Sequence, residues 1–431
     1  MKTLVTVGMA AATVGSMALQ AQDLTAAAPS KPWNISATVQ GFYDDNYTTA
    51  PANTPVGSPL VKRSSWGTDL NPGVSLDLLR DLTTIRLKYD YDARYYTDRV
   101  NNKWDQSHNV TASLSHSFSE RYKLELYDNF AVGQEPELLS PGGTPATGTY
   151  MRINGSNIRN YAGAALTSSF TEQLGSRIAY QNTFYEYDDK GHNASYSALL
   201  DRMEHLITLD LRWQYTPATL ALVGYQFGYT DQTSNDKLDV NGLVDANVRN
   251  RYDHYIFIGG DHDFNTQLSA KARVGAQIAT YPNANKGGIT GMEDSRVVPY
   301  ADAALQYKFS ERNLAQVGVK SGLNQTDVAV LSTTQATTTD TSALTLYASV
   351  TYALTPRLIS MARAQWQMAT FDGGLYNNQQ DNYYTADLNL SYEINRYLKA
   401  EAGYAYDRLD SDIAWRSYGR NRIYFGVSAN Y

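Results

Sequence analysis

The stretch from Thr84 to Tyr96 alternates apolar and charged side chains at every second residue. The odd-numbered positions from Ile85 to Tyr95 are apolar or tyrosine. The even-numbered positions carry full charges, at Arg86, Lys88, Asp90, Asp92 and Arg94. A side-chain period of two defines a β-strand. Ordinary strands run for about five or six residues, whereas a strand that crosses a membrane needs about 9 to 11. The stretch therefore predicts a strand that faces lipid on one side and water on the other.

The same pattern repeats from residue 33 to residue 431, and the connections alternate between short and long. Ser119-Glu120-Arg121 is one of the short turns, and residues 230–250 form one of the longer loops. Short periplasmic turns, longer external loops and an even strand number are typical of bacterial outer-membrane barrels. We predict a transmembrane, antiparallel, up-and-down β-barrel of eighteen strands, with sixteen as the alternative. Pro72 predicts a bulge or a late start in the second strand.

An apolar sheet face exposed to lipid forces the sheet to close. Hydrocarbon offers no partner to a backbone N–H or C=O at a sheet edge, so each unpaired group costs several kcal/mol. A barrel of 16 to 18 strands is too wide for side chains to fill and leaves an aqueous channel. A two-domain β-sandwich is the alternative fold, but its strands would be shorter and its inner faces dry.

The first residues predict export. Lys2, the small and apolar run from Leu4 to Leu19, and a cleavage point after Ala21 or Ala18 are typical of a secretory signal peptide. We therefore expect a signal peptide over 1–21, a periplasmic lead-in over 22–32 and the barrel over 33–431. The chain has no Cys, which excludes disulfides and thiolate metal sites. Its net charge of −7, without a basic patch, disfavours nucleic-acid binding.

The last alternating stretch, from Ile423 through Phe425 and Val427 to Tyr431, resembles the C-terminal signal that the barrel assembly machinery reads. Together with the signal peptide, the Ser-Glu-Arg and Thr-Pro-Arg turns and the tyrosine-rich alternation, the chain resembles the putative beta-barrel porin type 2 family over residues 33 to 431. The resemblance implies a pore in the outer membrane of a Gram-negative bacterium, in contact with lipid and lipopolysaccharide. Some members of the family are linked to exopolysaccharide operons, which implies an export or assembly component as the alternative function.

Catalytic and metal-binding patterns are weak. The richest cluster is Asp253-His254 with Asp261-His262-Asp263, but the two histidines have the lipid-facing parity and the carboxylates at 261 and 263 have the other. A site needs convergent groups, so we expect no enzyme centre and no cofactor here. The acidic loop Asn235–Asp245 does not match the spacing of an EF-hand, and a solvated external loop is the better interpretation.

Function is therefore expected in the lumen. The candidate lumen-lining residues are Arg86, Lys88, Asp90, Asp92, Arg94, Asp210, Arg212, Lys271, Arg273, Lys320, Arg363, Asp387, Lys399 and Glu401. Over all the inward-facing charges, which also include Lys123, Glu125, Arg177, Asp261, Asp302 and Glu393, the signs are nearly balanced, and no ring of one sign sets a strong ion preference. The sequence predicts a passive channel for small hydrophilic solutes. The loop over 131–156 either constricts the pore or caps its outer end.

Overall fold

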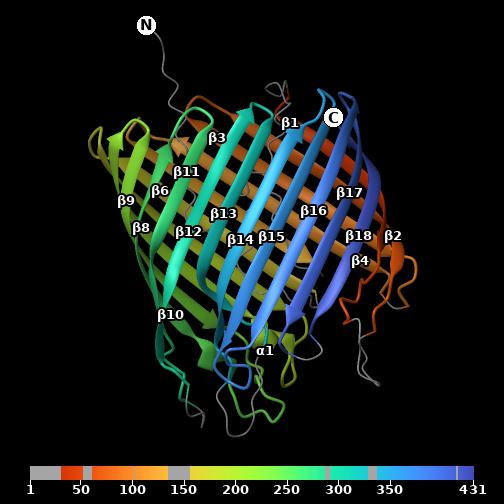
Figure 1. The fold of residues 1–431 in the computed structure, drawn as a ribbon, viewed down its shortest axis with the longest axis vertical. Coiled ribbons are helices and arrows are strands. Elements are labelled where there is room, and N and C mark those ends of the chain that lie inside the picture. Colours follow the sequence, from red (N-terminus) through yellow and green to blue (C-terminus); the bar gives the residue numbers. More distant parts are fainter. Residues whose placement is uncertain are drawn as a thin grey trace.

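The computed structural model describes residues 31–51, 61–100, 102–133, 156–286, 292–328, 337–413 and 416–431. Within these residues the chain forms eighteen antiparallel β-strands that close into one barrel (Figure 1), which confirms the predicted fold and strand number. The strands are β1 (Trp33–Asp44), β2 (Ser65–Leu79), β3 (Thr83–Tyr96), β4 (Trp104–Ser117), β5 (Tyr122–Gly133), β6 (Asn157–Ser169), β7 (Leu174–Tyr187), β8 (Arg202–Thr216), β9 (Thr219–Gln232), β10 (Arg251–Asp263), β11 (Leu268–Thr280), β12 (Ser295–Ser310), β13 (Asn313–Gln325), β14 (Asp340–Ala353), β15 (Leu358–Asp372), β16 (Gln380–Asn395), β17 (Leu398–Ser411) and β18 (Tyr418–Asn430). The signal peptide expected over 1–21 lies outside the described residues.

The barrel closes where β1 pairs with β18. Each strand pairs with its neighbours in the sequence, and β1 additionally pairs with β18 in an unbroken antiparallel register from Ser36 opposite Asn430 to Asp44 opposite Arg422. Ile35 and Tyr431 extend this pairing by two backbone hydrogen bonds of 3.1 and 2.9 Å. The first and last strands are therefore not free edges, as a sheet surrounded by lipid requires.

The two ends of the barrel differ in the length of their connections. Eight short turns, beginning with the one between β2 and β3, lie at the end of the barrel where the C-terminus lies (Figure 1). The longer loops and α1 (Tyr196–Leu200) lie at the opposite end (Figure 1). The 3₁₀ helix η1 (Ala246–Arg249) also belongs to a longer loop. We call these the short-turn end and the long-loop end. In the described part of the chain no helix is long and apolar enough to span a membrane.

The short turns are closed by residues whose side chains favour turns. Phe118, Phe170 and Phe264 each donate a backbone hydrogen bond of 2.8 to 3.0 Å to the carbonyl four residues on. Thr171 Oγ1 and Asn265 Oδ1 accept backbone N–H groups at 2.9 Å, which is the local bonding that places threonine and asparagine in turns. The three phenylalanine side chains are more than half exposed on the outside. They lie where an interfacial aromatic belt is expected.

The outer face of the barrel is apolar along the strands. Val74, Leu87 and Ile258 point outward and are 46%, 45% and 64% exposed. A soluble protein rarely exposes a contiguous apolar surface of this extent, because water would have to solvate it. The opposite parity is polar and charged. The alternation in the sequence thus becomes an apolar outer wall and a polar inner wall.

Inward-facing aromatic rings lie flat across glycines on neighbouring strands. Tyr347 of β14 is directly opposite Gly318 of β13, and a Cβ on that glycine would lie 2.3 Å from Tyr347 Cζ. The same arrangement recurs in four other directly opposed pairs, which are Phe42 with Gly67, Tyr127 with Gly163, Phe257 with Gly224 and Tyr424 with Gly403. Because each ring lies along the wall, it covers the backbone of its glycine.

The prediction of a bulge or a late start at Pro72 is wrong. β2 begins at Ser65, and its register with β1 runs without a shift from Ser65 to Leu76. Towards β3 the paired positions stop at Leu70 and resume at Gly73 in the same register. Proline removes a hydrogen-bond donor, but here it leaves only a local gap in the ladder.

We predict that Gly318→Val destabilises the barrel by about 1–3 kcal/mol, because the new side chain displaces the Tyr347 ring. The midpoint of urea unfolding in lipid vesicles, followed by tryptophan fluorescence, measures the change. Gly41→Ala is the matched control, since no atom lies within 4 Å of the position of its Cβ. Equal effects of the two substitutions would contradict the role of the ring.

Leu87→Arg places a charge on the outer face and is expected to cost up to about 2–4 kcal/mol, according to its depth in the bilayer. Arg86→Leu, one residue away on the inner face, is the control and is expected to leave the barrel folded. Heat-resistant migration of the folded barrel on gels reports both. A harmless change at 87 with a damaging one at 86 would show that the two faces are assigned the wrong way round.

Candidate functional site: the charged inner wall

The charged residues of β3 pair with carboxylates on the inner face. Arg86 Nε lies 3.3 Å from Asp77 Oδ1, and Lys88 Nζ lies 2.8 Å from Asp90 Oδ2. Arg94 lies 3.2 Å from Asp69 and 3.9 Å from Asp92. The charges thus neutralise one another locally, and the Arg86 and Lys88 pairs are exposed enough to meet solvent.

The other predicted residues are spread around the wall. Arg273 lies 2.9 Å from Asp261, Lys320 3.9 Å from Asp302 and Arg363 3.0 Å from Asp387. Lys271 is opposite Asp261, Lys399 is opposite Glu393, and Arg177 is opposite the fully buried Asp210, whose strand also carries Arg212. Arg177, Asp210, Arg212, Asp261 and Arg273 are close enough to interact electrostatically and form one cluster on β7, β8, β10 and β11. The Lys320 and Arg363 pairs are separate from it. Their part in solute passage stays a prediction.

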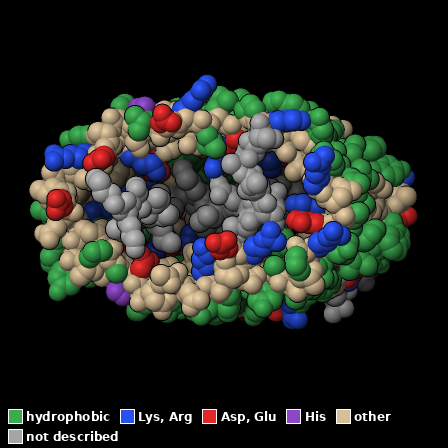
Figure 2. Space-filling view, turned by 90° about the horizontal axis from the view of Figure 1, so that it is seen from above, with side chains coloured by type: hydrophobic (Ala, Val, Ile, Leu, Met, Phe, Trp, Pro, Cys, Tyr) green, Lys and Arg blue, Asp and Glu red, His purple; other side chains and the backbone are tan. Residues whose placement is uncertain are grey.

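Seen from the short-turn end, the molecule has an oval outline that is hollowed at its centre (Figure 2). Acidic and basic side chains gather around the opening, and hydrophobic side chains lie on the outside (Figure 2). This view agrees with the mixed signs of the inner pairs.

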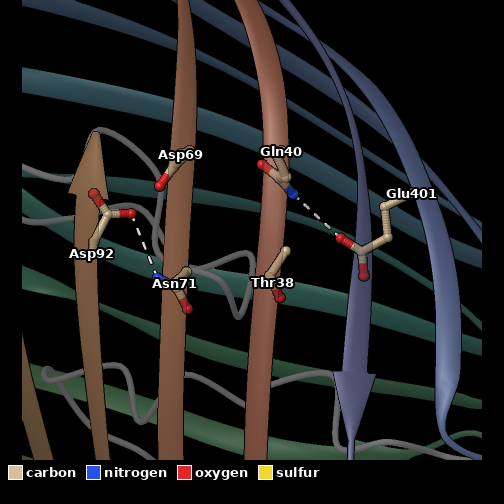
Figure 3. Close-up of a pocket in the computed structure, with 6 residues that line it drawn as sticks. All are labelled: Thr38, Gln40, Asp69, Asn71, Asp92 and Glu401. Carbon is tan, nitrogen blue, oxygen red and sulfur yellow. Dashed lines mark hydrogen bonds between the residues drawn. The ribbon is translucent and has the colours of Figure 1, made fainter. Parts of the chain in front are cut away.

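One recess in the inner wall brings several acceptors together (Figure 3). We call it the wall recess. Its volume is about 200 Å³, and it is lined by Thr38, Gln40, Asp69, Asn71, Asp92 and Glu401. Gln40 Nε2 donates to Glu401 Oε2 at 3.4 Å, and Asn71 Nδ2 donates to Asp92 Oδ2 at 3.5 Å. Carboxylates and amides so close together can accept hydrogen bonds from a hydroxyl or amine.

Gly426 of β18 lets the two sides of the wall recess meet. It lies between Gln40 of β1 and Glu401 of β17 and is directly opposite both residues. A Cβ at Gly426 would lie 2.4 Å from Gln40 Cγ and 2.5 Å from the Val39 carbonyl oxygen. A larger residue would therefore fill the space through which the Gln40 amide reaches Glu401.

Of the residues that line the wall recess, the sequence analysis predicted Asp92 and Glu401 as lumen-lining but not Asp69 or Asn71. The expected interruption at Pro72 left the inner face of β2 unassigned before that proline. Because the register of β2 against β1 is unbroken, Asp69 keeps the same parity as Asp77, and both face inward. Continuing the alternation through Pro72 would have identified it.

The long-loop end is filled by loops that pack on one another. An apolar group, here called the mouth cluster, joins α1, the loop before β10, the loop between β11 and β12, and the adjoining ends of β11, β12 and β13. It comprises Ala198, Leu238, Val244, Ala246, Val248, Ala279, Tyr281, Ala284, Met292, Val298 and Leu323. Arg249 is fully buried beside it and donates to the carbonyls of Leu199 at 3.1 Å and Thr326 at 2.6 Å. One side chain thus ties three loops together.

Burial shifts the pKa values of two titratable groups in these loops. Burial lowers the pKa of Arg249 to about 10, which still leaves the guanidinium protonated at neutral pH. Burial raises the pKa of Asp201 to about 6, although its carboxylate accepts hydrogen bonds from Ser197 Oγ and the Tyr187 N–H. Since the folded loop favours the protonated form, Asp201 stabilises the fold at low pH, and this contribution is lost as the pH rises through about 6.

Buried ion pairs cross the inner wall at the same end. Arg251 of β10 lies 2.8 Å from Asp253 and 3.4 Å from Asp340 of β14. Adjacent strands are about 4.8 Å apart, so four steps around the wall would separate β10 from β14 by about 19 Å. Gln232 of β9 likewise donates to Gln325 of β13 at 3.3 Å. The side chains of β9 to β14 therefore meet across the inner space, which narrows the lumen here.

A second buried group continues this narrowing towards β16. Arg416 lies 2.9 Å from Asp327 and 2.8 Å from Asp381, and it is almost fully buried. Arg420 pairs with Asp44 at the end of β1. Sequence reasoning missed these groups because their partners are far apart along the chain. The loop proposed to constrict the pore, 131–156, falls outside the described residues over 134–155.

The weak catalytic and metal candidates do not converge. His254 bonds Tyr225 on the outer face at 2.7 Å, and His262 bonds Thr219 at 2.9 Å, whereas Asp261 pairs with Arg273 on the inner face. In the acidic loop, Asp239 accepts backbone N–H groups of Asn241, Leu243 and Val244 at 2.7 to 3.1 Å. That carboxylate stabilises its own turn.

The comparisons with known proteins found similarity to porins. The family described as Putative beta-barrel porin 2 matches residues 321–431, so the resemblance is confirmed for this part of the chain, from β13 to β18. No curated protein matches the sequence. Solved structures similar in fold include OccAB4 of Acinetobacter baumannii (11% identity, 93% of this chain and 99% of that chain, TM-score 0.43), the outer membrane protein OpdK of Pseudomonas aeruginosa (12%, 93% and 99%, 0.42) and a BenF-like porin of Pseudomonas fluorescens Pf-5 (9%, 93% and 99%, 0.46). At these identities the similarity concerns the fold.

Arg249→Met is expected to loosen the mouth, because it keeps the length of the side chain but removes the hydrogen bonds to Leu199 and Thr326. We predict a higher single-channel conductance and faster proteolysis within the loop over 233–250. Arg408→Met is the control, since Arg408 is exposed and pairs with Asp410, two residues along the same strand. Unchanged conductance and proteolysis in the Arg249 variant would show that this arginine does not hold the mouth.

Proposed function

We propose that the protein is an outer-membrane channel through which small hydrophilic solutes diffuse passively. The observation that carries the proposal is the closed barrel with an apolar outer wall and a charged inner wall. Eighteen strands enclose a lumen too wide for side chains to fill. The outer wall suits lipid, and the inner wall suits water and polar solutes.

The arrangement of charges supports weak selectivity between ions. Cations and carboxylates alternate around the wall in pairs, as in Lys88 with Asp90 and Arg363 with Asp387. A ring of one sign would favour ions of the opposite sign, whereas paired charges present both kinds of partner to a passing solute. The wall recess adds neutral amide groups, which suits hydroxylated as well as charged solutes.

The same proposal gives the orientation of the barrel in the membrane and the partners of the protein. The short-turn end faces the periplasm and the long-loop end faces outward, as in bacterial outer-membrane barrels. The barrel contacts lipid and lipopolysaccharide, and the barrel assembly machinery recognises Phe425, Val427 and Tyr431. Tyr431 packs at the short-turn end, with its ring centroid 5.9 Å from that of Trp33. No catalytic step is part of this function.

Planar-bilayer recording of the purified protein tests the channel. We expect stepwise conductance that rises with salt concentration. A correctly folded barrel that never conducts, in the wild type and in Arg249→Met, would contradict the proposal. The second variant is needed because the narrowed mouth limits the current.

Lys88→Glu should shift ion selectivity towards cations without affecting assembly. The substitution removes the cation 2.8 Å from Asp90 and leaves two neighbouring carboxylates on the inner wall. In a salt gradient the reversal potential should move towards that of the cation. Lys88→Arg, which keeps the charge, is expected to behave as the wild type. A conducting Lys88→Glu channel with unchanged reversal potential would place this position outside the ion path.

A further inference from the structure

The wall of the barrel parts between β12 and β13 near the long-loop end. The ladder that joins these two strands ends where Ala301 is opposite Ser321. Among the described residues, the part of β12 from Ser295 to Tyr300 pairs with β11 alone, and residues 322–325 of β13 pair with β14 alone. The two strands therefore diverge beyond Ala301 and Ser321, although each keeps its other neighbour.

The diverging end of β13 folds towards the lumen together with the adjoining ends of β14 and β15. We call these ends the inner tip, which comprises residues 322–325, 340–342 and 370–372. Val317 of β13 and Leu346 of β14 point outward and are exposed. Three residues of the inner tip have the same parity on these strands but are buried, namely Leu323, Gln325 and Asp340. Their side chains are therefore covered by another part of the protein.

The cover is the inner wall of the barrel itself. Gln325 Oε1 accepts a hydrogen bond from Gln232 Nε2 of β9 at 3.3 Å. Asp340 lies 3.4 Å from Arg251 of β10 and 3.2 Å from Arg296 of β12. These three partners have the parity of the inner wall on their own strands. The outer face of the inner tip meets the inner face of β9 to β12 in this way because the tip has folded into the lumen.

Each side of the gap has a substitute for the missing ladder. The Leu323 N–H of β13 donates to Gln277 Oε1 of β11 at 2.9 Å, and Gln277 is fully buried. On β12 the Pro299 carbonyl accepts a hydrogen bond from Ser321 Oγ at 3.4 Å, and proline has no N–H to leave unpaired at a strand edge. If the register of the ladder continued, Leu323 would be directly opposite Pro299, and its N–H could bond the Pro299 carbonyl instead. The same N–H thus has an acceptor in two arrangements.

We propose that the inner tip is a gate with two positions. In the observed position it lies inside the lumen and narrows the mouth. In the second position residues 322–325 complete the ladder with residues 297–300 of β12, in the register that Ala301 and Ser321 already set, and the mouth is wide. The second position gains backbone hydrogen bonds and loses the polar contacts between the tip and the inner wall, so two discrete packings of the same strands compete. The inference rests on the proposed channel function and states how its mouth opens.

Pairs of cysteines distinguish the two positions, because the chain has no native Cys. Val298→Cys and Asn324→Cys are directly opposite in the continued register, at a separation that a disulfide can span. In the observed position Asn324 points away from β12, since it lies on the inner face of a tip whose outer face meets the wall. The matched control combines Val298→Cys with Thr341→Cys, because Thr341 is opposite Asn324 on β14, one strand further from β12.

The variants are assembled in lipid vesicles in reduced form, checked by their folded migration on gels, and then mildly oxidised. We expect the 298/324 pair to form an intramolecular disulfide and to raise the single-channel conductance, and a reductant should reverse both effects. The 298/341 pair should show neither. Adding Gln277→Leu to the 298/324 pair removes the acceptor of the Leu323 N–H and should speed disulfide formation. If the 298/324 pair does not assemble, Val297→Cys with Gln325→Cys makes the same test on the outer face.

The disulfide reports the movement of the inner tip separately from the current. No disulfide at 298/324 in a folded barrel, equal cross-linking of the 298/341 pair, or a 298/324 disulfide with unchanged conductance would each overturn the gate. Conducting channels in these cases would leave the channel function intact. A reversible 298/324 disulfide in a barrel that never conducts would instead support the movement of the inner tip and contradict the channel function.

Discussion

The pairing of β1 with β18 is the interaction on which the rest of the structure depends. In lipid every backbone donor and acceptor must find a partner within the protein, so a sheet with an apolar outer face is stable only as a closed cylinder. The unbroken register from Ser36 opposite Asn430 to Asp44 opposite Arg422 provides that closure. Once the sheet is closed, the alternation of side chains assigns every strand residue to the outer or the inner wall. The inward-facing charged residues thereby share one inner space although they come from strands all around the barrel.

Closure also explains how the inner wall is packed. A wide cylinder has room for rings such as Tyr347 and Tyr424 to lie along the wall, and the glycines opposite them provide the space. Charged side chains also stay close to the wall, because salt bridges between neighbouring strands pair most of them without filling the lumen. At the long-loop end the side chains instead bridge strands that are four apart, and the loops pack over them. The cylinder is therefore wide along its length and narrowed at the long-loop end.

The alternation along Thr84–Tyr96 and its repeats was enough to predict the barrel, its strand number and the faces of residues such as Arg86 and Leu87, because a period of two is a local property. The unbroken register at Pro72 was not predictable from the proline alone, since the pairing partners of β2 decide whether a missing donor becomes a bulge. The mouth was not predictable either. Arg249 bonds Thr326 and Arg251 pairs with Asp340, and nothing in the local sequence indicates that these distant residues meet.

The division into a lipid-facing and a water-facing wall is the central claim, and single-cysteine accessibility along β3 tests it most directly. Because the chain has no Cys, each residue from Ile85 to Ala93 can be replaced in turn without background labelling. With the protein in lipid vesicles, a charged, membrane-impermeant thiol reagent is expected to label the even-numbered positions and to spare the odd-numbered ones. Labelling of the odd-numbered positions instead, or equal labelling of both sets, would contradict the account.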